Sequence, residues 1–217
     1  MKLPWSSLAQ KARRNWCCCF MASAPRRRTW CPSAANLVPL GEAIAQSRSD
    51  AMVVSVDASH PSTLGSGKEW FSVVGITEQN RPERIARAMP LFLETVAHWQ
   101  QSSGIGPDAT ALVGFSQGAI VALEATQVDA MPSAAARVIA LAGRFAEPAR
   151  RAPQALRYHL IHGEEDRVVP TRASIDAARA LQALGAQVTL DLLPGLGHGI
   201  DSRAVRLLLA YLDRASS

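Results

Sequence analysis

The sequence predicts an α/β fold in which a mostly parallel central sheet carries helices on both faces. The chain has 217 residues, of which 48% are hydrophobic and 19% charged, so it is long and apolar enough for one domain with a folded core. From residue 37 onward, short apolar runs alternate with amphipathic stretches, which is the pattern of parallel strands joined by crossover helices. No run approaches the roughly 18 consecutive apolar residues of a transmembrane helix.

Short, continuously apolar runs are expected to form the buried strands of this sheet. These runs are residues 51–56, 109–113, 137–142, 158–161 and 187–193.

Amphipathic stretches between these runs are expected to form helices over residues 81–101, 117–126, 171–184 and 201–212. The first has an apolar stripe at helical spacing, and Pro90 is expected to kink it. Gly185 should close the third helix, and Asp201 should cap the last one. The stripe consists of Ile85, Met89, Phe92, Val96 and Trp99.

The charge of the chain is divided between two regions of different composition. A net charge of +5 would favour an acidic partner such as nucleic acid. However, residues 1–36 contain seven Lys and Arg and no acidic residue, which leaves the remainder with a net charge of −2. We therefore expect no nucleic-acid partner, and predict a disordered basic leader over residues 1–36 followed by one folded domain over residues 37–217.

The same leader contains all four cysteines, with Cys17, Cys18 and Cys19 adjacent and Cys31 alone. Zinc sites use ligand pairs two to four residues apart, which this spacing does not provide. A disulfide framework is also disfavoured, because the rest of the chain has no cysteine. We therefore expect no metal site, and interpret the cysteines as a cluster without a role in a reducing compartment.

A candidate nucleophile lies between the second predicted strand and the helix after it. Residues 114–118 (GFSQG) match the pattern G-x-S-x-G, which places a serine on a sharp turn above a sheet. Such a match can arise by chance, but the flanking strand and helix favour Ser116 as a nucleophile. Gly114 and Gly118 leave room for the turn, and the backbone N–H of Gln117 can donate to an oxyanion.

A serine nucleophile needs a histidine base and an orienting acid, in the chain order Ser, Asp or Glu, His. His198 is the preferred base, because it lies in a glycine-containing loop between the last strand and the last helix. His159 lies inside an apolar strand and is expected to be a core residue, whereas His162 ends that strand and is interpreted as a turn residue. Asp166 is the preferred acid because its loop is anchored by a strand before it and a helix after it. Glu164 and Glu165 remain alternatives.

Together these segments resemble the α/β-hydrolase superfamily and, within it, the phospholipase/carboxylesterase family, which includes the acyl-protein thioesterases. The resemblance covers residues 37–217. The segments that show it are residues 69–73 (EWFSV), 75–78 (GITE), 109–118 (ATALVGFSQG), 162–166 (HGEED) and 197–198 (GH). The first two of these segments indicate a bacterial esterase branch of the family.

The resemblance implies a cytoplasmic enzyme that hydrolyses short acyl esters or thioesters, small-molecule substrates, without a cofactor. It places the catalytic triad on Ser116, Asp166 and His198. It also implies that residues 65–81 border an acyl pocket, with Trp70 and Phe71 as substrate-binding candidates, although an ordinary surface loop remains an alternative. The sequence does not determine the oligomeric state, and a homodimer is one of the open alternatives.

The leader departs from the family where a strand ending in His-Gly-x-Gly should stand and the following loop should supply a second oxyanion N–H. We therefore predict that the first core strand is missing or aberrant. The codons of residues 15–22 can be read in another frame, in which the last base of each codon joins the first two bases of the next. This frame gives Leu-Val-Leu-Leu-Phe-His-Gly. Depending on the codons used, the Phe can instead be Leu and the His can instead be Tyr. Our hypothesis is that residues 11–32 are translated out of frame, through a sequencing error or a mutation.

Other interpretations remain open. The leader also has the composition of a transit peptide and, less closely, of a signal peptide. A chain without the second oxyanion donor could be an impaired hydrolase with a binding role. A flavodoxin-like domain is disfavoured because the chain lacks a phosphate-binding loop after the first strand.

Overall fold

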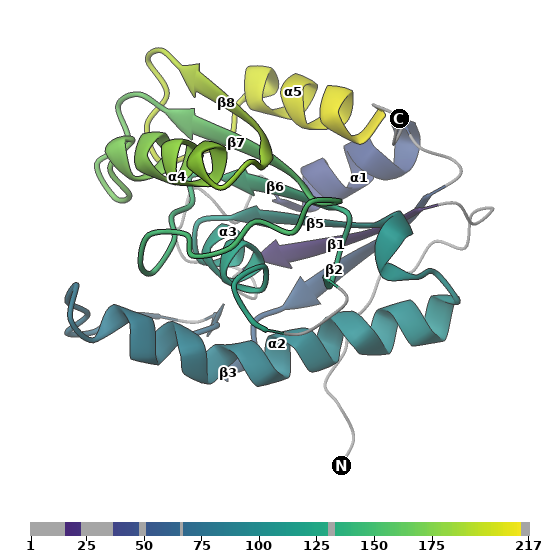
Figure 1. Ribbon diagram of the computed structural model, residues 1–217, viewed down its shortest axis with the longest axis horizontal. Coiled ribbons are helices and arrows are strands. Elements are labelled where there is room, and N and C mark those ends of the chain that lie inside the picture. The colour runs from purple at the N-terminus through teal and green to yellow at the C-terminus, as the bar shows by residue number, and fades with distance from the viewer. Residues whose placement is uncertain (1–15, 23–36, 48–50, 66, 130–132, 214–217) are drawn as a thin grey trace.

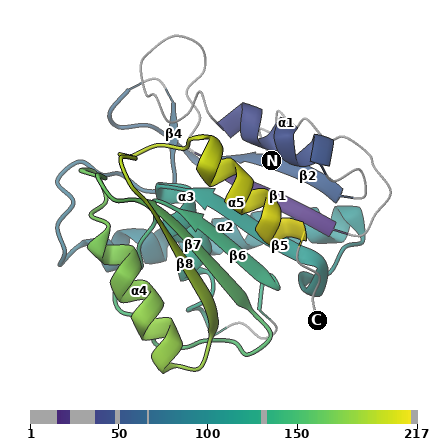
Figure 2. The same cartoon turned by 90° about the horizontal axis from the view of Figure 1, so that it is seen from above.

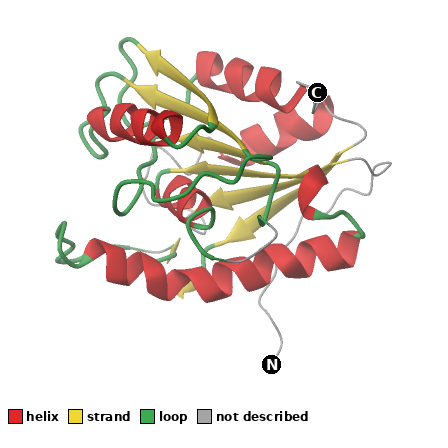
Figure 3. Ribbon diagram, viewed as in Figure 1, coloured by secondary structure: helices red, strands yellow, loops and turns green. Residues whose placement is uncertain are grey.

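A parallel sheet forms the centre of the fold in this computed structural model (Figures 1 and 3). The structure describes residues 16–22, 37–47, 51–65, 67–129 and 133–213. Within these residues, six strands run in the order β2-β1-β5-β6-β7-β8, and every neighbouring pair is parallel. The strands are β1 (Trp16–Ala22), β2 (Ala51–Asp57), β5 (Thr110–Phe115), β6 (Arg137–Leu141), β7 (Arg157–Gly163) and β8 (Gln187–Leu193).

Helices cover both faces of this sheet (Figures 1 and 2). Alternate side chains of a strand point to opposite faces, so Val113 packs with the helices on one face and Leu112 with those on the other. The predicted α/β fold with a parallel sheet between two helical layers is confirmed. One layer contains α1 (Leu37–Ser47) and α5 (Ser202–Asp213), and the other contains α2 (Arg81–Ser103), α3 (Gln117–Glu124) and α4 (Arg172–Ala183).

The helix ends follow the signals in the sequence. Asp201 caps α5, since its Oδ1 accepts hydrogen bonds from the N–H groups of Arg203 and Ala204 at 2.9 and 3.0 Å. Gly185 follows α4 with a left-handed φ of 80°, a conformation that glycine adopts without strain. Helix α2 continues through Pro90 to Ser103. None of the described helices is long and apolar enough to cross a membrane.

The prediction of a disordered leader is wrong for residues 16–22, and the first core strand, predicted to be missing or aberrant, is present with an unusual composition. These residues form β1, which pairs with β2 over Trp16–Ala22 and with β5 over Cys17–Met21. The physical reason is that cysteine behaves as a small hydrophobic residue, so the run has the apolar character of a central strand even though it lacks branched side chains. The rest of the leader lies outside the described residues.

The order of the strands creates a topological switch point beside β1. The chain passes from β1 to β2 on one side and then crosses to β5 on the other. In sheets of this kind, ligands bind at the carboxyl ends of the strands where the winding reverses. The end of β5 leads directly into Ser116 at this point.

A short antiparallel hairpin lies between β2 and α2 and was not expected from the sequence. It consists of β3 (His60–Pro61) and β4 (Lys68–Glu69). Lys68 forms an ion pair of 3.1 Å with Asp57 at the end of β2. This pair ties the hairpin to the carboxyl edge of the sheet, and the chain continues from it into residues 70–80.

Candidate active site

Ser116 lies on a strained turn between β5 and α3. Its φ of 54° and ψ of −119° fall where residues with a Cβ are rarely found. The turn is tight, because a Cβ on Gly114 would lie 2.3 Å from the carbonyl carbon of Gly118. The Ser116 N–H donates to the Leu141 carbonyl at 2.9 Å, which fixes the turn to the neighbouring β6. The local geometry is that of a nucleophile elbow.

His198 lies in the loop between β8 and α5 and reaches the serine from 82 residues away. Its Nε2 is 3.0 Å from the Ser116 Oγ. The centroid of its ring lies 4.9 Å from the centroid of the Phe115 ring. The loop packs closely on the end of β7, since a Cβ on Gly163 would lie 2.2 Å from the Leu196 carbonyl oxygen. The glycine at the end of β7 therefore lets the histidine loop approach the elbow.

Asp166 contacts the other nitrogen of this imidazole. Its Oδ2 lies 2.7 Å from the His198 Nδ1, and its Oδ1 accepts the N–H groups of Val168 and Val169 at 2.8 and 2.9 Å. Burial raises the pKa of Asp166, but the hydrogen bonds from His198, Val169 and Val168 outweigh that effect and hold it below its usual value. The alternatives Glu164 and Glu165 are both exposed.

His162 is a member of this cluster that the sequence analysis missed. It is only 1% exposed, and its Nε2 lies 3.1 Å from the Asp166 Oδ2 and 2.9 Å from the Val169 carbonyl oxygen. The interpretation of His162 as a turn residue is therefore wrong. The spacing of four residues between His162 and Asp166, with a glycine after the histidine, is the signal that could have indicated it.

Gln117 faces the site with its backbone and the neighbouring loop with its side chain. As the first residue of α3, it has a backbone N–H without an intrahelical acceptor, which is free to bind an anion at the helix start. Its side-chain Oε1 accepts from the backbone N–H of Trp70 at 3.0 Å, and its Nε2 donates to the backbone carbonyl of Phe71 at 3.1 Å. The family's second oxyanion donor, which this sequence is expected to lack, would follow β1 in residues 23–36, outside the described residues.

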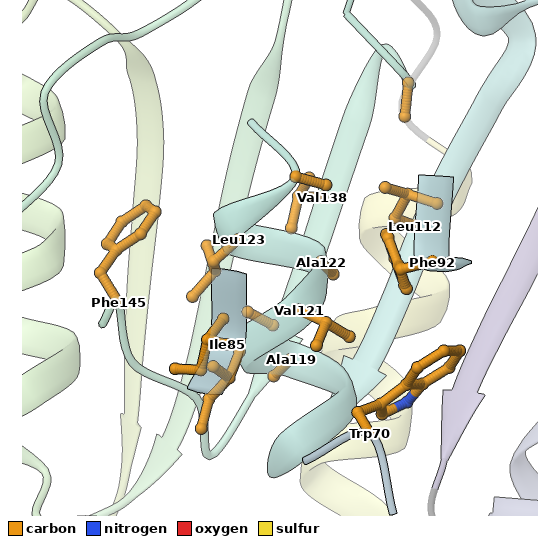
Figure 4. Packing of buried hydrophobic residues seen from close by; sticks show 14 of the residues in the cluster. Trp70, Ile85, Phe92, Leu112, Ala119, Val121, Ala122, Leu123, Val138 and Phe145 are labelled. Carbon is orange, nitrogen blue, oxygen red and sulfur yellow. The ribbon is translucent and has the colours of Figure 1, made fainter. Parts of the chain in front are cut away.

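The rings of Trp70 and Phe71 pack into the core beside this site. They are 1% and 5% exposed, and Trp70 meets Phe92 of α2 edge-on with ring centroids 5.3 Å apart (Figure 4). It is the backbone of Trp70 and Phe71 that faces Gln117. The two side chains therefore expose little surface to which a substrate could bind, which disfavours the expectation that they bind it.

No group of three or more His, Cys, Asp or Glu side chains is placed to hold a metal ion in the described part of the chain. The candidate site residues Ser116, His198 and Asp166 are joined by two hydrogen bonds. This arrangement can transfer a proton from a hydroxyl to an imidazole that a carboxylate orients, which is the chemistry of acyl transfer.

Residues 38–216 match the phospholipase/carboxylesterase family. The chain belongs to this family. The resemblance found in the sequence is thereby confirmed, and the protein is an enzyme of the hydrolase class. A relative in the family, esterase YpfH of Escherichia coli (strain K12), is 49% identical over 163 residues, which cover 75% of this chain and 69% of the relative.

Solved structures of esterases share the fold of this family member. Esterase PE8 matches with a TM-score of 0.81 and 27% identity over 95% of this chain and 97% of its own. The Bacillus cereus carboxylesterase matches with a TM-score of 0.76 and 15% identity, over 95% and 92% of the two chains. A carboxylesterase from Mesorhizobium loti has a TM-score of 0.73 and 17% identity, over 93% and 90%. The α/β-hydrolase fold is confirmed.

Proposed function

We propose that this protein is a serine esterase that hydrolyses short acyl carboxylic esters or thioesters through an acyl-enzyme. Ser116 is the nucleophile, His198 the general base and Asp166 the orienting acid. The observation that carries the proposal is the continuous hydrogen-bonded chain from the Ser116 Oγ through His198 to the Asp166 carboxylate. The esterase relative and the esterase neighbours in structure support the same reaction class.

Acylation begins with attack of the Ser116 Oγ on the acyl carbonyl carbon while the His198 Nε2 accepts the hydroxyl proton. The Asp166 carboxylate accepts a hydrogen bond from the His198 Nδ1–H and stabilises the imidazolium that forms. The carbonyl oxygen becomes an oxyanion beside the first turn of α3, where the Gln117 N–H donates to it. The carbon–oxygen or carbon–sulfur bond then breaks, and the leaving alcohol or thiol takes the proton from the imidazolium.

Deacylation repeats these steps with water as the nucleophile. His198 removes a proton from the water, which attacks the acyl carbon of the ester on Ser116. The bond to the Ser116 Oγ breaks, and the oxygen recovers its proton from the imidazolium. The products are a carboxylic acid and free enzyme, and no step requires a cofactor.

The substrate we propose is a small acyl ester or thioester whose acyl chain lies along the loop after β4. Arg84 holds this loop by donating from its Nη1 to the carbonyls of Ser72 and Val74, both at 2.8 Å. Arg144 binds Glu78 of the same loop through both carboxylate oxygens, at 3.2 and 2.8 Å. The loop after β4, fixed by these two arginines, suits the wall of a pocket for a short acyl chain of defined length. A cytoplasmic location, as the family resemblance implies, is part of the proposal.

Labelling with a fluorophosphonate probe tests the nucleophile directly. We expect the folded protein to be labelled and to hydrolyse short p-nitrophenyl esters, and we expect Ser116→Ala to lose both. Ser55→Ala, at an exposed serine of β2, is the matched control and should behave as the unmodified chain does. Labelling that persists in Ser116→Ala would contradict the assignment. A folded chain that is neither labelled nor active would favour a binding role instead.

A further inference from the structure

A second histidine contacts the carboxylate that orients His198. His162 at the end of β7 lies with its Nε2 3.1 Å from the Asp166 Oδ2, and the same oxygen lies 2.7 Å from the His198 Nδ1. We propose that His162 is a positioning residue, which holds the Asp166 carboxylate in place and limits how strongly it stabilises the imidazolium form of His198. This inference rests on the proposed function, because it assigns a role toward the same triad.

The hydrogen-bond partners of His162 determine which nitrogen carries its proton. The Val169 carbonyl oxygen, 2.9 Å from the Nε2, can only accept, so the Nε2 must be protonated. The Nδ1 then faces the Ser174 hydroxyl of α4 at 2.7 Å, whose single hydrogen it shares with the Gly143 carbonyl, to which the hydroxyl donates at 3.2 Å. The Val169 carbonyl thus fixes the proton of His162 on the Nε2, the nitrogen that lies beside Asp166.

His162 stays neutral while it makes these contacts. Burial lowers its pKa, and that effect outweighs the opposing ones from the Val169 carbonyl and the Asp166 carboxylate. The charged or titratable groups that face it are Asp166 in its own loop and His198 from the loop after β8. Helix α4 contributes the uncharged Ser174 and the loop after β6 a carbonyl. His162 therefore acts as a neutral N–H donor and not as a second cation.

This donor completes the hydrogen bonds of the catalytic carboxylate. The Oδ1 of Asp166 already accepts two backbone N–H groups, from Val168 and Val169. The Oδ2 lies between the two histidines, 2.7 Å from the His198 Nδ1 and 3.1 Å from the His162 Nε2, so the carboxylate is held on both sides in its place beside His198. A donor on Oδ2 also draws negative charge from the oxygen that faces His198. Its removal should strengthen the attraction between Asp166 and the imidazolium.

His162→Phe removes the donor while it keeps a ring in the buried site. We expect the acidic limb of the kcat/KM profile to move to higher pH by about half a unit to one unit, because one hydrogen bond to the charged carboxylate is lost. We expect kcat on the alkaline plateau to fall about 2- to 10-fold, because the carboxylate is held less well. His162→Gln returns an N–H near the Nε2 position and should restore most of both.

His159→Phe is the matched control on the same strand. His159 is also buried, at 5% exposure, but its Nδ1 pairs with Thr189 of β8 and its ring stacks on Tyr211 of α5. Both phenylalanine variants should lower the melting temperature, since each replaces a buried hydrogen-bonding ring. Only the His162 variant should move the pH profile. Equal profiles for the two would show that His162 has a structural role alone and would overturn the inference.

A readout that does not depend on turnover separates this inference from the proposed function. In a Ser116→Ala background, the proton between the His198 Nδ1 and Asp166 should give a low-field NMR signal that shifts when His162→Phe is added and returns with His162→Gln. Ser174→Ala offers a milder variant if His162→Phe fails to fold, and it should move the signal in the same direction. An unchanged signal in both would overturn the role of His162, whether or not Ser116 proves to be the nucleophile.

Discussion

Ser116 has a strained backbone at the carboxyl ends of the strands. Its φ of 54° with a ψ of −119° costs on the order of 1–3 kcal/mol relative to an ordinary conformation. The surroundings compensate, since its N–H donates to Leu141 at 2.9 Å and its carbonyl accepts the Ile120 N–H at 3.0 Å. The strained conformation lifts the hydroxyl above the strand ends, where the His198 imidazole can reach it.

The contact between Gly114 and Gly118 should be essential to this geometry. A Cβ on Gly114 would lie 2.3 Å from Gly118 backbone atoms, so Gly114→Ala must separate β5 from α3. We expect it to lower the free energy of unfolding by about 1–3 kcal/mol and to reduce kcat by at least tenfold, as measured by urea unfolding and ester hydrolysis.

Gly41→Ala is the control for that prediction. Gly41 lies in α1, and outside its own helix backbone and its chain neighbours the described residues place no atom within 4 Å of its would-be Cβ, so the change should stabilise the helix by about 0.5–1 kcal/mol and leave kcat unaltered. If Gly114→Ala gave the same result as Gly41→Ala, the close approach would not be required for the elbow.

Ser116, Asp166 and His198 could be selected from the sequence because each follows a predicted strand, and parallel strands bring their carboxyl ends to one edge of a sheet. The contact of His162 with Asp166 could not be predicted, since it depends on how the loop after β7 folds back against α4. The rings of Trp70 and Phe71 were expected on the substrate side, because a motif does not reveal the direction in which a side chain points.

At the scale of single elements, the start of α5 positions the loop that carries His198. Asp201 caps this helix, and although burial raises its pKa, hydrogen bonds from Ala204 and Arg203 hold the pKa below its usual value. A carboxyl whose pKa is lowered by folding stabilises the protein above its unfolded pKa, near 3.9. That stabilisation is lost as the pH falls through the folded pKa.

We therefore expect Asp201→Ala to lower the free energy of unfolding at pH 7 by about 0.5–2 kcal/mol. Asp201→Asn keeps an accepting oxygen, so it should lose less at pH 7 and should not share the acid-dependent part of the loss. Asp176→Ala, which breaks an exposed ion pair with Arg172 on α4, should cost less than about 1 kcal/mol. Urea unfolding at pH 7 and at about pH 2, below the folded pKa, measures all three, and equal losses for the two alanine variants at pH 7 would contradict the cap.

The side chain of Gln117 links two further elements, the start of α3 and the segment after β4. Gln117→Met keeps the length but leaves the Trp70 N–H and the Phe71 carbonyl without this partner. We expect a loss of about 1–3 kcal/mol in unfolding free energy and a higher KM, because the proposed acyl wall is no longer tied to the elbow. Gln187→Met on the edge strand β8, where Gln187 accepts from Arg157, should leave KM unchanged. If the two methionine variants had the same KM, Gln117 would not link the acyl wall to the elbow.

At the scale of the whole molecule, the pattern after residue 37 was sufficient to predict the layers, because hydrophobic periodicity determines which faces are buried. The strands expected over 51–56, 109–113, 137–142, 158–161 and 187–193 all formed, with ends shifted by a few residues. Strand β1 was the exception. Its composition was unusual enough to be judged a leader, whereas its place between β2 and β5 depends on long-range pairing that local patterns do not contain.

The position of β1 sharpens the frameshift hypothesis. The out-of-step codons of residues 15–22 encode Leu-Val-Leu-Leu-Phe-His-Gly, seven residues that would replace those of the strand Trp16–Ala22. Branched side chains favour a central parallel strand, and burying each added methylene contributes about 0.8 kcal/mol. A chain restored in frame over residues 11–32 should therefore unfold at a higher temperature than the chain described here.

The restored chain should also regain the glycine-containing loop after β1 and with it the second oxyanion donor, so we expect kcat to rise about 10²–10³-fold. Changing only Cys17, Cys18 and Cys19 to Val-Leu-Leu is the matched control, because it adds apolar volume in β1 without the loop. That control should raise the melting temperature and leave kcat nearly unaltered. Thermal unfolding and ester hydrolysis of the three proteins separate packing from chemistry. If the restored chain matched the present one in both measurements, the sequence as it stands would be the functional form.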